Sequence, residues 1–363
     1  MAPYFFDWLK HPNDDAYWTR WSIRGHYKDI TVPALNFDGW YDIFINGALQ
    51  NFNGMRTQAG SAAARQGTQL VVGPWLHIPW SQTVGQINFG PRAANPIDQL
   101  QLNWFDYWLK GIHNGVNKQP KVQIFVMGAD KWRTSDTWPL RGTQYVRYYL
   151  HSLGGANSAK GNGSLSTKKI SPRGAAADRY IYNPRKPVLS IGGRFQSSVP
   201  GGPYDQRPLL GRNDILVFTT PPLRHKLAVI GPITVTLYAS SSARDTDWTA
   251  KLDDVYPEGT SMLIEYGIQR ARYRNSETHP TLIHPGRIYK YTIHVWPTAN
   301  LFKPGHRIRL EISSSNFPMY DRNPNTGDPF AQNATLKTAR QTVYHDPAHP
   351  SHMTLPIAPL GAH

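Results

Sequence analysis

Residues 30–72 have the pattern of a strand, a helix and a second strand. Residues 30–37 form an apolar run that leads into a glycine-containing loop, and Gln-Leu-Val-Val at 69–72 is a second short apolar run. The apolar positions at helical spacing between the two runs are Ile45, Ala48, Leu49 and Phe52. A strand–helix–strand unit of this kind has parallel strands and a right-handed crossover. The sequence therefore predicts part of a parallel α/β sheet.

Two side chains with catalytic chemistry follow the two predicted strands. Asp42 comes after the first strand and His77 after the second. Parallel strands end at the same edge of a sheet, where α/β folds place their ligands, so the two side chains can meet there. A carboxylate that orients an imidazole is the acid–base pair of a serine-hydrolase triad, and the order Asp before His is the order of α/β-hydrolases. Ordinary loop residues are the alternative interpretation on spacing alone.

The nucleophile of such a triad is absent from the chain. A hydrolase elbow has the pattern Gly-x-Ser-x-Gly, which occurs nowhere in these 363 residues. Ser81 lies four residues after His77, but its surroundings do not predict a strand–turn–helix elbow. We therefore expect the acid and the base of a triad without its nucleophilic serine.

The rest of the chain divides into a helical and a β-rich part. Residues 4–22 are aromatic-rich and predict helix, and a further helix is expected from Pro96 to Lys110, with Asn95 as its cap and Gly111 as its stop. Residues 121–127 read as a strand leading to a second domain. Residues 151–178 are rich in Gly, Ser, Ala and Lys and predict a surface connection. Beyond them, residues 289–295 and 307–312 alternate apolar and polar side chains, which indicates an antiparallel sandwich.

Composition narrows the functional classes. The chain has no cysteine, which excludes disulfides, zinc–thiolate sites and a cysteine nucleophile. Its formal net charge is +15, but the basic residues are scattered singly, which favours a solvated surface over a nucleic-acid site. No stretch approaches the roughly 20 apolar residues that span a bilayer, and no signal peptide begins the chain, so a cytoplasmic location is expected. The loop at residues 321–328 imitates a calcium loop, but Thr326 stands where glycine is required. We expect no metal there.

The segments around Asp42 and His77 are specific sequence motifs. The acid loop reads Gly-Trp-Tyr-Asp-Ile-Phe over residues 39–44, and the base loop reads Gly-Pro-Trp-Leu-His over residues 73–77. Further motifs of the same kind lie at residues 125–129, 201–208, 240–247, 305–310, 314–318 and 349–352. Together they resemble the CocE/NonD-type serine hydrolases, which include cocaine-esterase-like, glutaryl-acylase-like and α-amino-ester hydrolases and are related to the X-prolyl dipeptidyl-peptidases. The resemblance covers essentially the whole chain.

The resemblance implies a fold of class α/β plus all-β. Residues 1–23 would be the end of a helical cap, residues 24–138 the C-terminal portion of an α/β-hydrolase domain, and residues 139–363 a jelly-roll sandwich with a flexible connection at about 151–178. The chain would then be N-terminally truncated, with the Gly-x-Ser-Tyr-x-Gly elbow of the family missing. It would need no metal or organic cofactor.

The resemblance also implies roles for individual residues. Asp42 and His77 would be catalytic, and Phe44 would line the acyl pocket. Trp40, Tyr41 and Trp75 flank the pair and would contact substrate, with core packing as the alternative. Asp15 would hold a substrate's ammonium group, with a carboxylate at a helix start as the alternative.

Three functions remain open at this point. The first is the C-terminal part of a serine hydrolase that cleaves ester or amide bonds, acyl or X-prolyl dipeptidyl, and is inactive alone. Its partner would be a small ester, amide or peptide substrate, with no nucleic acid and no membrane. The second is a non-catalytic jelly-roll binding module. The third is one half of a split hydrolase. The sequence leaves the substrate and any homo-oligomer undetermined.

Overall fold

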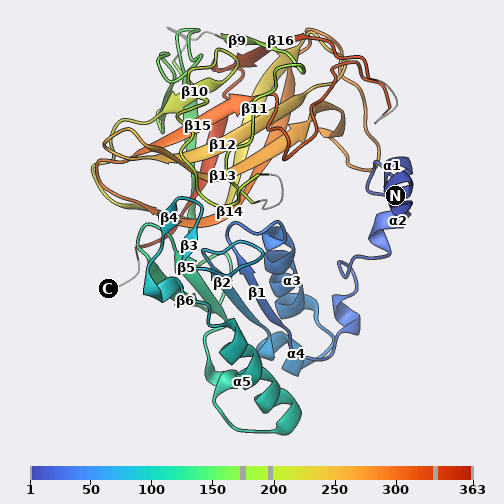
Figure 1. The fold of residues 1–363 in the computed structure, drawn as a ribbon, viewed down its shortest axis with the longest axis vertical. Helices are drawn as coiled ribbons and strands as arrows, with labels where there is room; N and C mark the ends of the chain where they lie inside the picture. Colours follow the sequence, from blue (N-terminus) through green and yellow to red (C-terminus); the bar gives the residue numbers. More distant parts are fainter. Residues whose placement is uncertain (1, 172–176, 195–198, 330–333, 361–363) are drawn as a thin grey trace.

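The computed structural model describes residues 2–171, 177–194, 199–329 and 334–360. A small α/β sheet lies below a large β-sandwich, and the first helices lie along the side of the sandwich (Figure 1). The α-helices are α1 (Tyr4–Lys10), α2 (Ala16–Thr19), α3 (Ile45–Gln58), α4 (Ala62–Gly67) and α5 (Ile97–Lys110). Short 3-10 turns are η1 (Tyr27–Asp29), η2 (Pro91–Ala93), η3 (Val116–Lys118) and η4 (Ala271–Tyr273).

The strands fall into three sheets. The small sheet has the order β1 (Leu35–Gly39), β2 (Gln69–Gly73), β5 (Val122–Val126) and β6 (Lys131–Ser135). A two-stranded ribbon pairs β3 (Thr83–Val84) with β4 (Ile87–Asn88). The sandwich strands are β7 (Gln144–His151), β8 (Ser164–Ser166), β9 (Ala177–Tyr182), β10 (Leu216–Thr219), β11 (Leu227–Ser241), β12 (Asp247–Val255), β13 (Ser261–Arg270), β14 (Tyr289–Phe302), β15 (Arg307–Ser313), β16 (Ala339–Tyr344) and β17 (His352–Ile357).

The predicted strand–helix–strand unit is confirmed. Strands β1 and β2 are parallel and in register from Leu35 opposite Gln69 to Gly39 opposite Gly73. The connecting helix α3 buries Ile45, Leu49 and Phe52 against the sheet. Strand β5, the strand expected at residues 121–127, adds to β2 in parallel, and β6 pairs antiparallel with its other side. Both β1 and β2 therefore end at the same edge.

Helix α5 also follows its sequence signals. The Asn95 side chain accepts a hydrogen bond from Ile97 N at 2.7 Å, and Gly111 ends the helix at a φ of 70°, where glycine carries no Cβ penalty. Ile97 and Trp104 are buried, and Leu100 packs against the core beside Ile97. The apolar stripe of this helix is therefore core packing.

The N-terminal region differs from the single helical stretch expected over residues 4–22. Helix α1 ends at Lys10, and α2 covers only Ala16–Thr19. Pro12 lacks an amide donor and disfavours helical backbone at His11, so the helix stops there. Asp15 begins α2 anew by accepting a hydrogen bond from Tyr17 N.

The sandwich encloses the larger hydrophobic core. Strands β14 and β15 alternate in burial as their sequences predict, with Tyr291, Ile293, Ile308 and Leu310 at 0% exposure. They do not pair with each other: β14 pairs antiparallel with β11, whereas β15 lies antiparallel between β10 and β12. The antiparallel sandwich is thus confirmed, with long-range strand pairing.

The connection expected at residues 151–178 is partly wrong. Strand β8 lies inside it and pairs with β7 and β10, and Leu165 is fully buried in the sandwich core. One leucine between two serines satisfies the alternation of a short strand, which a Gly/Ser-rich composition conceals. Residues 172–176 of this segment lie outside the described part of the chain.

The small sheet and the sandwich share a core and main-chain hydrogen bonds. Met127 N donates to Ala299 O at 2.9 Å, and Leu301 N donates to Met127 O at 2.8 Å. A second core runs from Trp40, beside the small sheet, to Ile230 on β11. The sandwich therefore packs directly on the layer that carries Asp42 and His77.

Candidate active site

The acid and base loops are tied together by their backbones. Beyond the paired ends of β1 and β2, Trp40 N donates to Gly73 O at 2.9 Å and Tyr41 N donates to Trp75 O at 3.0 Å. Asp42 N then closes a turn on Gly39 O at 3.0 Å. The strand ladder thus continues into the loops and sets the position of Asp42 relative to the base loop.

Two glycines permit this close approach. A Cβ built on Gly39 would lie 2.1 Å from Trp75 O, and one on Gly73 would lie 2.4 Å from the Trp75 ring. Both distances are far below van der Waals contact, and the first opposing atom belongs to the backbone. The glycines that begin the Gly-Trp-Tyr-Asp and Gly-Pro-Trp motifs are therefore required by close packing at the strand ends.

Asp42 and His77 form a hydrogen-bonded pair. His77 Nδ1 lies 3.0 Å from Asp42 Oδ2, and Asp42 Oδ1 accepts a hydrogen bond from Phe44 N at 2.9 Å. The Asp42 side chain is 6% exposed and that of His77 is 44% exposed. A buried carboxylate that holds one nitrogen leaves the other nitrogen of the imidazole for a substrate or nucleophile. The acid–base pair expected from topology is brought together.

The aromatic residues around the pair fall into two groups. Trp40, Tyr41 and Trp75 are at most 1% exposed, and the indole nitrogens of both tryptophans donate to backbone carbonyls, at 2.7 and 2.8 Å. Their positions are those of core residues, the alternative interpretation above. Phe44 is 57% exposed, and its ring meets His77 edge-on with 5.2 Å between the centroids. Phe44 is thus an apolar wall beside the base.

Asp38 is a site residue that the sequence reasoning missed. It is 7% exposed at the end of β1, and its Oδ1 accepts a hydrogen bond from Gly39 N at 2.7 Å. Burial, and then the charge of Asp42, raise the pKa of Asp38 to about 8. The available signal was a carboxylate within an apolar strand, four residues before Asp42.

Ser81 is not placed as a nucleophile. Its Oγ accepts a hydrogen bond from Thr83 N at 3.2 Å within an irregular loop. In the part of the chain that the structure describes, no serine hydroxyl is hydrogen-bonded to His77.

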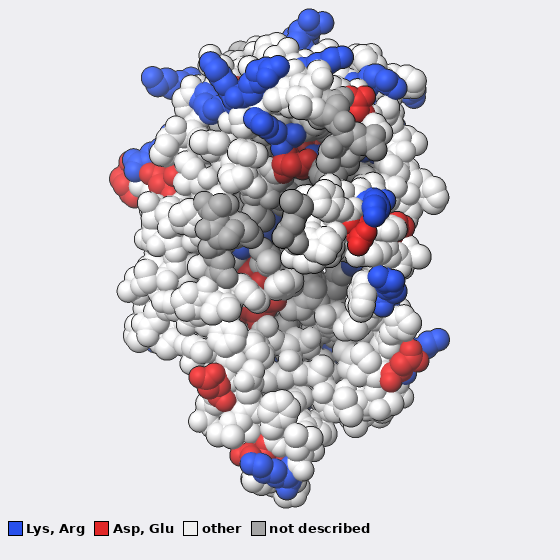
Figure 2. All heavy atoms as spheres, turned by 45° about the vertical axis from the view of Figure 1, so that its right-hand side comes forward, with Lys and Arg blue, Asp and Glu red and all other residues white. Residues whose placement is uncertain are grey.

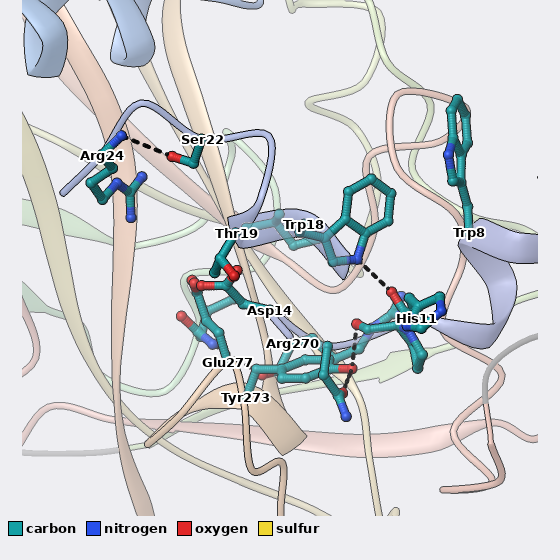
Figure 3. Close-up of a pocket in the computed structure, with 14 residues that line it drawn as sticks. Trp8, His11, Asp14, Trp18, Thr19, Ser22, Arg24, Arg270, Tyr273 and Glu277 are labelled. Carbon is teal, nitrogen blue, oxygen red and sulfur yellow. Dashed lines mark hydrogen bonds between the residues drawn. The ribbon is translucent and has the colours of Figure 1, made fainter. Parts of the chain in front are cut away.

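Asp15 lies outside this constellation, at the N-terminus of α2. Its carboxylate accepts from Tyr17 N and contacts His11 Nδ1 at 2.7 Å, the role of a helix cap. A neighbouring cavity of about 810 Å³ between the N-terminal helices and the sandwich is lined by Asp14, Trp18 and Glu277, among others, but not by Asp15 (Figure 3). The ammonium-binding role stays a prediction.

Surface charge is unevenly spread over the face drawn in Figure 2. Lys and Arg side chains are densest at the sandwich end, whereas acidic side chains lie in the hollow at the middle of that face. The net positive charge of the chain is therefore not gathered in this hollow.

Among the described helices, none is long and apolar enough to cross a membrane.

Comparisons with known proteins match this fold. The family model described as the X-Pro dipeptidyl-peptidase C-terminal non-catalytic domain matches residues 114–354, which is more than half of the chain. This chain belongs to the family of the X-Pro dipeptidyl-peptidase C-terminal domain. The model of the X-Pro dipeptidyl-peptidase S15 family matches residues 2–79, the segment that contains Asp42 and His77.

The chain is also similar to proteins with curated names and to solved structures. Cocaine esterase from Rhodococcus sp. (strain MB1 Bresler) is 40% identical over 98% of this chain and 62% of its own length. An aminopeptidase from a marine sediment Thaumarchaeota archaeon has a TM-score of 0.85 at 27% identity, over 98% of this chain and 60% of that one. An α-amino acid ester hydrolase has a TM-score of 0.84 at 27% identity, over 98% and 61%. The chain thus spans about three fifths of these relatives.

Proposed function

We propose that this chain supplies the acid and base of a serine hydrolase, whose nucleophile comes from residues outside the chain. The 3.0 Å contact between His77 and Asp42, at the ends of two parallel strands, carries this proposal. The similar proteins support hydrolase chemistry, because their names are those of an esterase, an ester hydrolase and an aminopeptidase.

His77 would act first as a general base and then as a general acid. With its Nδ1 proton held by Asp42, Nε2 accepts the proton of the serine hydroxyl as Oγ attacks the carbonyl carbon. The resulting imidazolium is stabilised by the Asp42 carboxylate and returns the proton to the leaving alcohol or amine. Water then attacks the acyl-enzyme with His77 as base, which releases the acid and regenerates the serine.

Esters are the substrate class that we favour over amides. The esterase relative is 40% identical to this chain, whereas the putative Xaa-Pro dipeptidyl-peptidase from Streptomyces avermitilis is 24% identical. Phe44 offers an exposed apolar ring beside His77, which suits an apolar acyl group. Asp42 and His77 do the chemistry, and Phe44 contributes to the acyl pocket.

The test is to restore the nucleophile in trans. The chain is co-expressed with the part of the Rhodococcus esterase that it does not match, and the pair is assayed on p-nitrophenyl acetate and with a fluorophosphonate probe. We expect labelling and turnover of the pair, loss of both with His77→Ala, and neither with the chain alone. His26→Ala is the matched control, because His26 forms an exposed i,i+3 pair with Asp29.

Two results would contradict the proposal. Stoichiometric labelling of the chain alone, abolished by His77→Ala, would place the nucleophile within the chain. A stable complex with turnover that His77→Ala leaves unchanged would remove His77 from the chemistry. If the partner part binds without any labelling, the non-catalytic module becomes the better description.

A further inference from the structure

An open hollow of about 480 Å³ lies in the connection between β13 and β14. All of the residues that line it fall within residues 274–290, and none of them is Asp or Glu. None belongs to the acid or base loop, so the hollow is separate from the candidate active site. The lining residues used below are Arg274, Leu282, His284, Arg287, Tyr289 and Lys290.

Arg274 differs from the two arginines that precede it at alternate positions. Arg270 forms an ion pair with Asp247. Arg272 forms an ion pair with Asp245. Both of these carboxylates are buried. In the described part of the chain, no carboxylate forms an ion pair with Arg274, so this arginine alone of the three lacks a counter-charge.

Arg274 is nevertheless held in place. Its Nη1 donates hydrogen bonds to Ala271 O and Thr281 O. Its guanidinium carbon lies 4.5 Å from the ring centroid of Tyr289. Within the described residues, Nε and Nη2 of this guanidinium have no hydrogen-bond partner. A fixed guanidinium with unused donors and no counter-charge is the arrangement that binds an oxyanion.

Two further cations lie beside Arg274. The guanidinium carbon of Arg287 lies 5.4 Å from the same Tyr289 ring centroid, so two positive charges contact one ring. Lys290 is exposed at the start of β14 and lines the same hollow. Neither Arg287 nor Lys290 has an ion-pair partner among the described residues. Like charges that are gathered without a carboxylate create a positive potential, which favours the binding of an anion.

The backbone that carries these cations is fixed to the sandwich. Gly286 N donates to Ser241 O on β11 at 2.8 Å, and Arg287 N closes a turn on His284 O at 3.1 Å. Gly286 has a φ of 80° in this turn, which glycine adopts without a Cβ penalty. His284 N donates to the Tyr289 hydroxyl at 3.0 Å and so ties the turn to the ring. The hollow is therefore formed before any ligand binds.

We propose that this hollow binds a phosphate monoester, whose dianionic phosphate group is held by Arg274, Arg287 and Lys290. Guanidinium groups match tetrahedral oxyanions with paired N–H donors. Three cations without an acid among the lining residues favour a dianion over a monoanion. The Tyr289 ring and Leu282 offer an apolar surface to the organic group of the ester. The site does not depend on the proposed hydrolase activity or on a serine.

The experiment titrates the purified chain with phenyl phosphate by calorimetry and by phosphorus NMR at pH 7.5 and low salt. A phosphate monoester is mostly dianionic at this pH, because its second pKa is about 6. Benzenesulfonate is the control compound, since it keeps the ring and a tetrahedral oxyanion but carries a single negative charge. We expect saturable binding of phenyl phosphate and roughly tenfold weaker binding of benzenesulfonate. Inorganic phosphate, which lacks the ring, should also bind more weakly than phenyl phosphate.

Variants locate the binding. Arg287→Gln removes one charge at an exposed turn position and is expected to fold. It should weaken phenyl phosphate binding roughly tenfold, because one charge-assisted hydrogen bond is lost. Lys290→Gln should weaken binding to a smaller extent. Arg141→Gln is the matched control, because it removes the same charge at an exposed position that does not line the hollow, and it should bind as the parent does.

The proposal is overturned by any of five results. These are no saturable binding up to the solubility limit, equal binding of benzenesulfonate, equal binding of inorganic phosphate, unchanged binding by Arg287→Gln, and an equal loss with Arg141→Gln. Folding of each variant is checked by circular dichroism and thermal unfolding. If Arg287→Gln does not fold, Lys290→Gln and the comparison of the compounds still decide the outcome. Hydrolase assays play no part, so this proposal and the proposed function fail separately.

Discussion

His77 Nδ1 lies 3.0 Å from Asp42 Oδ2, although 35 residues separate the two along the chain. The contact exists because β1 and β2 are parallel neighbours and their loops continue the backbone ladder through Tyr41 and Trp75. The geometry of the pair is therefore set by main-chain hydrogen bonds, which are largely independent of the side chains that line a substrate pocket.

Asp42→Asn should remove the orientation of the base without disturbing the fold. In the complemented enzyme we expect kcat to fall by about three to four powers of ten, because an amide favours the wrong imidazole tautomer and no longer stabilises the imidazolium. Esterase kinetics with p-nitrophenyl acetate measure the effect. Asp29→Asn, in the exposed His26 pair, is the control and should keep parental kcat. A loss below tenfold for Asp42→Asn would contradict the assignment.

Trp40 and Phe44 lie four positions apart in the acid loop and differ in exposure, at 0% and 57%. Trp40→Ala should lower the free energy of unfolding by about 3–5 kcal/mol, because it opens a cavity and leaves Phe125 O without its donor. Phe44→Ala should change stability by less than about 0.5 kcal/mol but raise KM for esters of apolar acids. Urea unfolding and esterase assays separate the two effects. Equal stability losses would show that Phe44 is also structural.

Asp38 should make stability depend on pH. Its native pKa of about 8 lies above the ordinary value of 3.8, so between these values the folded state holds a proton that the unfolded state has released. The free energy of unfolding therefore falls as pH rises through this window, by up to about 1.4 kcal/mol per pH unit from this group. Asp38→Asn removes that contribution.

The comparison is made by urea unfolding of the parent and Asp38→Asn at pH 5, 6 and 7. The variant should gain stability relative to the parent at each step upward, whereas Asp98→Asn, at an exposed position in α5, should follow the parent. Parallel curves for the parent and Asp38→Asn would mean that Asp38 is ionised in the native state throughout.

Arg194 and Glu265 form an ion pair with both side chains 1% exposed. The guanidinium lies 4.2 Å from the ring centroid of Tyr266 and 3.7 Å from that of Trp296. Arg194→Met should cost about 3–5 kcal/mol, since it leaves Glu265 buried and unpaired. Arg194→Lys should also destabilise, because an ammonium group cannot stack between two rings as a planar guanidinium does.

Urea unfolding measures these losses, and Arg207→Met is the control. Arg207 is 55% exposed in its pair with Asp205, so its loss should cost at most about 1 kcal/mol. The double variant Arg194→Met with Glu265→Leu should recover part of the stability lost in Arg194→Met. A single-variant loss equal to that of the control would contradict the buried-pair argument.

Local sequence patterns predicted the elements that bring the site together. Helical spacing around Leu49, two short apolar runs and the order of Asp42 and His77 were sufficient for the parallel unit and its edge. They could not predict the protonation of Asp38, because the pKa of a carboxyl depends on burial and on neighbours that only the folded loop supplies.

In the sandwich, local sequence patterns predict strands but not the strands with which they pair. Alternation predicts half-buried strands at residues 289–295 and 307–312, but the strands with which they pair are set by packing over sequence separations that no local pattern records. Strand β8 was hidden because Leu165 is its single apolar side chain in a glycine- and serine-rich segment.

The hydrogen bonds that Met127 makes with Ala299 and Leu301 restrict the crossover positions at which a chimera of two family members can fold. A chimera that replaces the sandwich with that of another member severs a ladder between the two layers unless the two matching segments travel together. The turn at Gly128 adds a second restriction, because a Cβ there would lie 2.4 Å from Leu301 O. Recombination within this family should therefore succeed at exposed loops such as residues 111–115 and fail at crossovers that separate residues 127–129 from residues 299–301.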